Sequence, residues 1–210
     1  MIAVENEVIR LINEIENVKG QLRKQEHLSR YADIQVLFRF KDRGAPIADG
    51  SSSFNWINQL NITDVIQSFQ YNYTYGSKQS SGSIPTGFAQ YKSKKDLKAT
   101  SHDGVFYRIY TVEPKPRAND SFWAEAVSKR MTEAGYHPLD GQDSIQAEQL
   151  EKGYLIQTLA PNGADDLCYW IAFHQRGAKL IIIEALGEVS RFTHYEKEIK
   201  AAIHSSLSSP

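Results

Sequence analysis

The stretch "DLCYWIAFHQRGAKLIIIEALG", residues 166 to 187, decides the fold of this chain. Two long apolar runs flank Arg176 and Gly177, and turn residues between two such runs are typical of a β-hairpin. From Leu180 to Leu186 the second run carries apolar side chains on both faces, as a central strand covered by helices does. The stretch therefore predicts an antiparallel hairpin at the centre of a sheet with a helix on each face.

Glu184 is the charged residue within that second run. It lies near the end of the strand, beside Ala185, Leu186 and Gly187, so we expect its carboxylate to reach water there. No second carboxylate can be matched to it from the sequence, and paired acid–base catalysis is therefore not indicated. A structural role is predicted for Glu184.

Alternating patterns predict further strands on the N-terminal side of the hairpin. The segments are residues 33–40 (DIQVLFRF), 68–76 (SFQYNYTYG), 88–92 (FAQYK), 105–114 (VFYRIYTVEP) and two strands within 144–161. The last two lie on either side of Glu151 to Gly153. Residues 54–65 (FNWINQLNITDV) fit either a helix or a strand.

Two helices complete this region. Residues 121 to 134 follow an N-cap at Asp120 or Ser121, end before Gly135, and carry an apolar stripe of Trp123, Val127, Met131 and Ala134. The last helix opens with a capping box of Thr193 and Glu196. The order of elements predicts an α+β fold, an antiparallel sheet sandwiched between helices (α/β/α), with an N-terminal amphipathic helix.

The N-terminal segment has a heptad pattern. Its apolar residues alternate steps of four and three: Val4, Val8, Leu11, Ile15, Val18 and Leu22. Glu14 at position g and Lys19 at the next e could pair across a parallel dimer. Because Gln25 ends this seam after about three heptads, two interpretations stay open. The helix packs on its own domain, or it contacts another chain.

The chain thus divides into a heptad-patterned helical arm, residues 1–30, and a single α+β sandwich domain, residues 31–210. Aromatic residues are enriched at interfaces, so the alternating tyrosines join the arm as candidates for partner contact. The candidate interaction residues are Val8, Leu11, Ile15, Val18, Tyr71 and Tyr73.

Composition excludes several classes of protein. A net charge of −1 and a pI of about 6.6 do not indicate a nucleic-acid partner. No stretch approaches the roughly 20 apolar residues of a membrane span. The start lacks the basic and apolar regions of a signal peptide, so we expect a cytoplasmic protein as written, or a cell-envelope protein if a leader has been removed.

Residue pairs that could carry chemistry are better explained structurally. Cys168 and His174 share a face of one strand but lie about 20 Å apart, too far for nucleophilic catalysis. His194 and Glu198 would need a third metal ligand from elsewhere. The lysines 92, 94, 95 and 98 are interrupted by Asp96 and fit a solvated loop. The sequence therefore predicts no catalytic, cofactor-binding or metal-binding residue.

Four segments together resemble the PsbP-like superfamily: "VFYRIYTV", "FWAEAVSKRMTEAGY", "CYWIAFHQRGAKLIIIEALGE" and "FTHYEKEIKAAIHSSL". The resemblance covers roughly residues 104 to 207. The superfamily contains the PsbP extrinsic subunit of photosystem II, a Ran-binding nuclear import factor and bacterial lipoproteins. It implies a mostly non-enzymatic protein, here a bacterial accessory subunit, that docks to other proteins.

The expected function is that of a non-catalytic protein-interaction module, an accessory of a larger assembly with a protein partner and no cofactor. Two alternatives stay open. One is a self-assembling scaffold, a homo-oligomer formed through the N-terminal helix. The other is a small-ligand binder or hydrolase with a pocket under the long loops.

Overall fold

A computed structural model describes residues 10–11, 14–19, 21, 52–71, 81–91, 93, 95–139, 141, 143–162 and 165–209. The chain forms two compact units, Met1–Phe40 and Lys41–Pro210, and each is described by itself. In the first unit, residues 10–11, 14–19 and 21 are helical. The strand predicted at residues 33–40 lies outside the described residues, and the domain limits 1–30 and 31–210 stay predictions.

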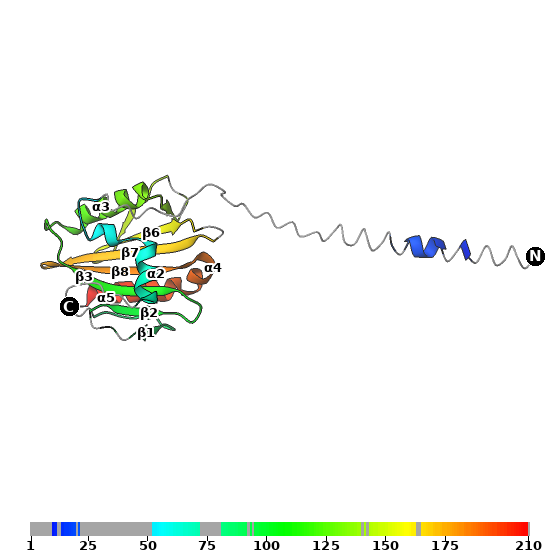
Figure 1. Ribbon diagram of the computed structural model, residues 1–210, viewed down its shortest axis with the longest axis horizontal. Helices are drawn as coiled ribbons and strands as arrows, with labels where there is room; N and C mark the ends of the chain where they lie inside the picture. Colours follow the sequence, from blue (N-terminus) through cyan, green and yellow to red (C-terminus); the bar gives the residue numbers. More distant parts are fainter. Residues whose placement is uncertain are drawn as a thin grey trace, which may run out of the picture. The chain divides into compact units, whose positions relative to one another are not determined.

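The second unit is built on one antiparallel sheet with the strand order β1-β2-β3-β8-β7-β6-β4, and β5 also pairs with β6 (Figure 1). The strands are β1 (Ala89–Tyr91), β2 (Leu97–Thr100), β3 (Phe106–Val112), β4 (His137–Pro138), β5 (Ala147–Gln149), β6 (Tyr154–Ala160), β7 (Leu167–Arg176) and β8 (Lys179–Glu188). The predicted strands at residues 105–114 and 144–161 are confirmed, and that at 88–92 is confirmed over residues 89–91.

The hairpin of β7 and β8 lies at the centre of this sheet, as predicted. Arg176 pairs with Lys179, so the turn comprises Gly177 and Ala178, one residue later than expected. Gly177 has a φ of 60°, a left-handed conformation that glycine adopts without steric cost. The position of this glycine therefore sets the turn.

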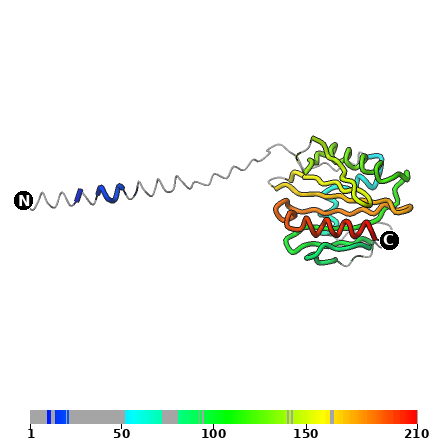
Figure 2. Tube along the Cα trace, turned by 180° about the vertical axis from the view of Figure 1, so that it is seen from behind, coloured from blue at the N-terminus to red at the C-terminus, as the bar shows by residue number. Residues whose placement is uncertain are grey.

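Helices cover both faces of the sheet. The 3₁₀ helix η1 (Ile57–Gln59), α2 (Ile62–Gln70) and α3 (Asp120–Glu133) pack on one face. On the other face lie α4 (Val189–Phe192), the 3₁₀ helix η2 (Thr193–Tyr195) and α5 (Glu196–Ser208). In Figure 1, α2 crosses in front of the sheet, and in Figure 2, seen from behind, α5 crosses it in red. The predicted α/β/α sandwich is confirmed.

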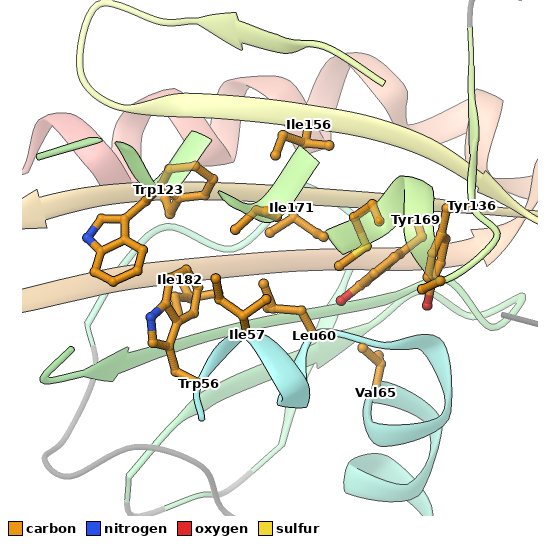
Figure 3. Packing of buried hydrophobic residues seen from close by; sticks show 14 of the residues in the cluster. Trp56, Ile57, Leu60, Val65, Trp123, Tyr136, Ile156, Tyr169, Ile171 and Ile182 are labelled. Atoms are coloured by element: carbon orange, nitrogen blue, oxygen red, sulfur yellow. The ribbon is translucent and has the colours of Figure 1, made fainter. Parts of the chain in front are cut away.

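Each face has its own hydrophobic core, because alternate residues of β8 point to opposite sides. Ile182 belongs to the core beneath α2 and α3, and Ile183 to the core beneath α5. In the first core the rings of Trp56 and Trp123 meet edge to face at 5.2 Å between centroids (Figure 3). The sheet is therefore buried on both sides by the domain's own helices.

The prediction of a strand at residues 68–76 is wrong for its described part, because α2 extends to Gln70. The Asn61 side chain accepts a hydrogen bond from the Asp64 amide at 2.8 Å and starts the helix. Ile62 and Val65 then fall on one helical face and are buried. This cap and its apolar face outweigh the alternating aromatic pattern that begins inside the same helix.

Both predicted helix starts need correction. The N-cap of α3 is Asn119, whose side chain accepts from the Phe122 amide at 3.0 Å, and α3 begins at Asp120. Thr193 forms no capping box, because its backbone is already helical and its hydroxyl donates to the Val189 carbonyl at 2.8 Å. The chain thus turns through α4 and η2 before α5 begins.

Candidate functional site

Glu184 is fully buried, contrary to the expectation that its carboxylate reaches water. The reason lies in the sheet: β8 runs on to Glu188, and β3 and β7 flank it on both sides. Arg108 and Ile171 are the register partners of Glu184 on these two neighbours. A residue just past the middle of a central strand is therefore covered by strands at its sides and a helix above.

The Glu184 carboxylate is held by groups from the two neighbouring strands. Arg108 of β3 donates from Nε to Oε2 at 2.6 Å, and neither side chain is exposed. The Tyr169 hydroxyl of β7 donates to Oε1. The guanidinium carbon of Arg108 also lies 5.1 Å from the centre of the Tyr110 ring. We call Lys98, Arg108, Tyr110, Tyr169 and Glu184 the buried polar cluster.

Burial and charge fix the protonation states in this cluster. Burial raises the pKa of Tyr169 and of Tyr110 well above the ordinary tyrosine value, and the nearby Glu184 charge adds to the rise. Burial alone would lower the pKa of Arg108, but the Glu184 carboxylate together with Tyr110 and Tyr169 reverses this effect and raises the pKa. The cluster is thus an ion pair with neutral tyrosine hydroxyls around it.

Two buried cations of this cluster hold α2 against the sheet. Lys98 of β2 donates from Nζ to the Ser68 carbonyl at 2.9 Å, and Asp96 lies 3.5 Å from the same nitrogen. Arg108 donates from Nη1 to the Asp64 carbonyl at 3.4 Å. Burial lowers the pKa of Lys98, and the Asp96 charge opposes that shift. Arg108 and Glu184 have no exposed surface, and their pair joins β3 and β8 beneath α2.

The buried polar cluster is not among the sequence-based predictions, although the sequence carries a signal for it. Arg108 interrupts the apolar run "VFYRIYTV", and Glu184 interrupts "KLIIIEAL". Two opposite charges inside two apolar strands indicate a buried pair, since isolated charges are rarely buried. Lys98, assigned to a solvated loop, is likewise buried within β2, between Leu97 and Ala99.

Cys168 and His174 occupy different surroundings, as expected from their spacing along β7. Cys168 belongs to the core beneath α5. Burial raises the pKa of its thiol to about 11, with smaller contributions from Glu196 and Asp166. His174 is half-buried, and its Nδ1 lies 2.8 Å from the Asp120 carboxylate. The thiol and the imidazole therefore have separate structural environments.

Cys168 should consequently react slowly with iodoacetamide near neutral pH. A thiol with a pKa of about 11 remains protonated there, so we expect alkylation about 100-fold or more slower than in guanidinium chloride. Intact mass measured against time gives both rates, and Cys168→Ser serves as the unreactive control. Equal rates in the folded and denatured protein would contradict the buried, protonated thiol.

Other described histidines and the lysine cluster do not converge on one centre. His102 Nδ1 lies 3.1 Å from the Tyr195 hydroxyl at the surface. His194 is exposed and Glu198 half-buried, and the described residues contain no group of three or more metal-ligating His, Cys, Asp or Glu side chains. Lys92 and Lys94 lie outside the described residues. Of the other two lysines, Lys95 is exposed in a bend, as expected of a solvated loop, whereas Lys98 is buried.

The candidate interaction residues that are described are exposed. On the helical arm, the exposed fractions of Leu11, Ile15 and Val18 are 46%, 53% and 56%. Tyr71, directly after α2, is 65% exposed. Val8 and Tyr73 lie outside the described residues. Leu11, Ile15 and Val18, which we call the arm stripe, are thus aliphatic side chains available to a partner on the arm itself.

A groove of about 310 Å³ lies between β4, β5 and β6, lined by Pro138, Leu139, Gln146, Ala147, Glu148, Leu155 and Gln157. Its volume is at the lower end of those of small-molecule pockets. Gln157 donates to the Glu148 carboxylate at 3.1 Å, so these two polar groups of the groove bind one another.

No helix among the described residues has both the length and the apolar character needed to cross a membrane.

The described fold defines the class: an α/β/α sandwich around one antiparallel sheet. No family model matches the chain, and no curated protein matches it. Among solved structures, LpqN, involved in cell envelope biogenesis of Mycobacterium tuberculosis, is similar, with 6% sequence identity and a TM-score of 0.44. That likeness covers 68% of this chain and 93% of LpqN. At this level it carries no argument about function, and the resemblance to the PsbP-like superfamily stays a prediction.

Proposed function

We propose that this protein is a non-catalytic protein-interaction module, an accessory of a larger assembly, which binds its partner through the N-terminal arm. The observation that carries the proposal is the arm stripe. Leu11, Ile15 and Val18 follow one another in steps of four and three, so they form one line on the helix, and about half of each side chain is exposed. Burying such a line against a partner removes apolar surface from water.

The sandwich domain supports this role as a folded unit with its own cores. Its charged groups Arg108 and Glu184 are paired with each other in the interior, and its two cores are closed by its own helices. Tyr71 adds an exposed aromatic side chain on the domain. Tyrosine is enriched at protein interfaces, so it provides a second contact of the same kind.

Affinity capture from cells that make the protein tests the proposal with the variant Ile15→Asp. A carboxylate in the middle of the arm stripe should abolish capture of the partner, because binding would have to bury the charge. Asn17→Asp is the matched control: it places the same carboxylate two residues away on the same exposed helix, outside the stripe. Quantitative mass spectrometry of the captured proteins compares both variants with the wild type.

The expected result is a partner recovered by the wild type and by Asn17→Asp but lost with Ile15→Asp. The same set of proteins captured by all three chains would contradict an interaction through the arm. The melting temperature of the domain should be unchanged in both variants, which separates lost contact from lost folding.

A further inference from the structure

We propose that the partner of the arm is a second copy of this chain, and that two arms pair in parallel as a two-stranded coiled coil along Leu11, Ile15 and Val18. This inference rests on the proposed function and specifies its partner.

The arm stripe has the spacing of a coiled-coil seam. Leu11, Ile15 and Val18 occupy positions d, a and d of a heptad, and all three are helical and exposed. In parallel coiled coils a β-branched residue at a combined with leucine at d favours two strands. Ile15 and Leu11 provide this combination, and Val18 places a β-branched residue at the following d. The sequence continues the same register at Val8 and Leu22.

The charges beside the stripe select a parallel pair of identical arms. Glu14 and Lys19 are five residues apart, so at about 100° per residue they lie on opposite flanks of the stripe and cannot pair within one helix. In a parallel dimer position g of one helix faces the following position e of the other, which brings Glu14 of each chain to Lys19 of its partner. In an antiparallel dimer the two Glu14 side chains would face each other and repel.

The described surface of the sandwich domain is a poor alternative binding site for the arm stripe. Both faces of its sheet are already covered by α2 and α3 on one side and α5 on the other. The exposed large hydrophobic residues among the described part of the domain are three aromatic side chains, Tyr71, Tyr91 and Phe122. None of these three is aliphatic, whereas a second arm presents the same aliphatic stripe in a complementary spacing.

Sedimentation equilibrium of the full chain tests the inference first through the seam. The wild type should show a concentration-dependent monomer–dimer equilibrium, because three heptads give only a moderately stable pair. Ile15→Asp should weaken dimerisation by about 100-fold or more, since each dimer loses two buried isoleucines and would bury two carboxylates. Asn17→Asp should leave the dimer unchanged. A monomeric wild type, or a dimer unaffected by Ile15→Asp, would overturn the inference.

Charge exchange then tests the parallel arrangement. Glu14→Lys and Lys19→Glu should each dimerise less well alone, because each homodimer then has like charges at both flanks. Mixing the two variants should restore dimers that contain one chain of each, seen by native mass spectrometry with one chain isotope-labelled. Glu16→Lys is the control, since position 16 lies away from the seam. In an antiparallel pair like charges already face each other in the wild type, so variants that dimerise alone as well as the wild type would overturn the parallel pairing. Equal homodimer and heterodimer formation in the mixture would contradict pairing through these charges.

These results separate the inference from the proposed function. A monomeric wild type whose captured partner is lost with Ile15→Asp overturns the second copy as partner and leaves the interaction module intact. The second possible outcome is a dimer that changes with the charge variants as expected, while all variants capture the same other proteins. It would support a second copy as the partner of the arm and contradict binding of a different protein through the arm. A fall in the melting temperature of a monomer with Ile15→Asp would show that the stripe packs on its own domain, and it would overturn both.

Discussion

Replacing Glu184 by alanine should lower the free energy of unfolding by about 3–5 kcal/mol. The substitution leaves the Arg108 guanidinium buried at zero exposure without the carboxylate 2.6 Å from its Nε. The Tyr169 hydroxyl loses its acceptor in the same step. An uncompensated buried charge is among the costliest changes in a folded protein, which explains the size of the effect. Urea unfolding followed by tryptophan fluorescence measures it.

Glu188→Ala is the matched control for this prediction. Glu188 ends the same strand, and its carboxylate pairs with Arg191 at 3.1 Å near the surface. Partly exposed pairs contribute at most about 1 kcal/mol, so this variant should remain close to the wild type. Equal losses for Glu184→Ala and Glu188→Ala would contradict a buried, charged pair in the centre of the sheet.

A double replacement separates the net contribution of the ion pair to stability from the cost of leaving one of its charges buried without a partner. Arg108→Met together with Glu184→Leu removes both charges and keeps apolar volume beneath α2. Replacing a buried ion pair by apolar side chains is often neutral or stabilising, so the double variant should lose much less than Glu184→Ala. A loss in the double variant as large as that of Glu184→Ala would show that the attachment of α2 through Arg108 and the Asp64 carbonyl dominates.

The hairpin could be predicted from sequence because its information is local. Apolar residues on both faces of residues 180–186 imply cover on both sides, and Gly177 marks the turn. The burial of Glu184 could not be predicted in the same way. It depends on β3, about 75 residues earlier in the chain, which places Arg108 directly opposite. Pattern reasoning shows which face a side chain takes but not which strand lies beside it.

The error at α2 has a different physical origin. Alternating aromatic residues from Phe69 onward are typical of a strand, whereas Asn61 and the spacing of Ile62 and Val65 favour a helix. Both patterns overlap in residues 68–70, and the cap decides between them. The buried Lys98 then donates to the Ser68 carbonyl near the end of α2, a contact that no local pattern reveals. The candidate interaction residues of the arm could be chosen from sequence because heptad spacing is local.

Gly153→Ala should lower the free energy of unfolding by about 2–5 kcal/mol, the second large effect expected in the domain. Gly153 has a φ of 82°, in the left-handed region that disfavours side chains. A Cβ atom there would lie 2.1 Å from the carbonyl oxygen of Phe173 and 3.0 Å from Cβ of His174. The oxygen belongs to the backbone of β7, whose Phe173 pairs with Tyr154 at the start of β6, so it cannot move aside without disturbing that pairing.

Gly177→Ala isolates the backbone contribution to that loss. Gly177 also has a positive φ, 60°, but nothing lies within 4 Å of the position its Cβ would take. This variant should therefore cost about 1–2 kcal/mol, the strain of a left-handed alanine alone. Urea unfolding of both variants gives the difference, which measures the contact between Gly153 and the β7 backbone. Equal losses in free energy of unfolding for the two variants would show that the β5–β6 turn adjusts to the added Cβ atom. The close approach of Gly153 to Phe173 would then not constrain the sheet.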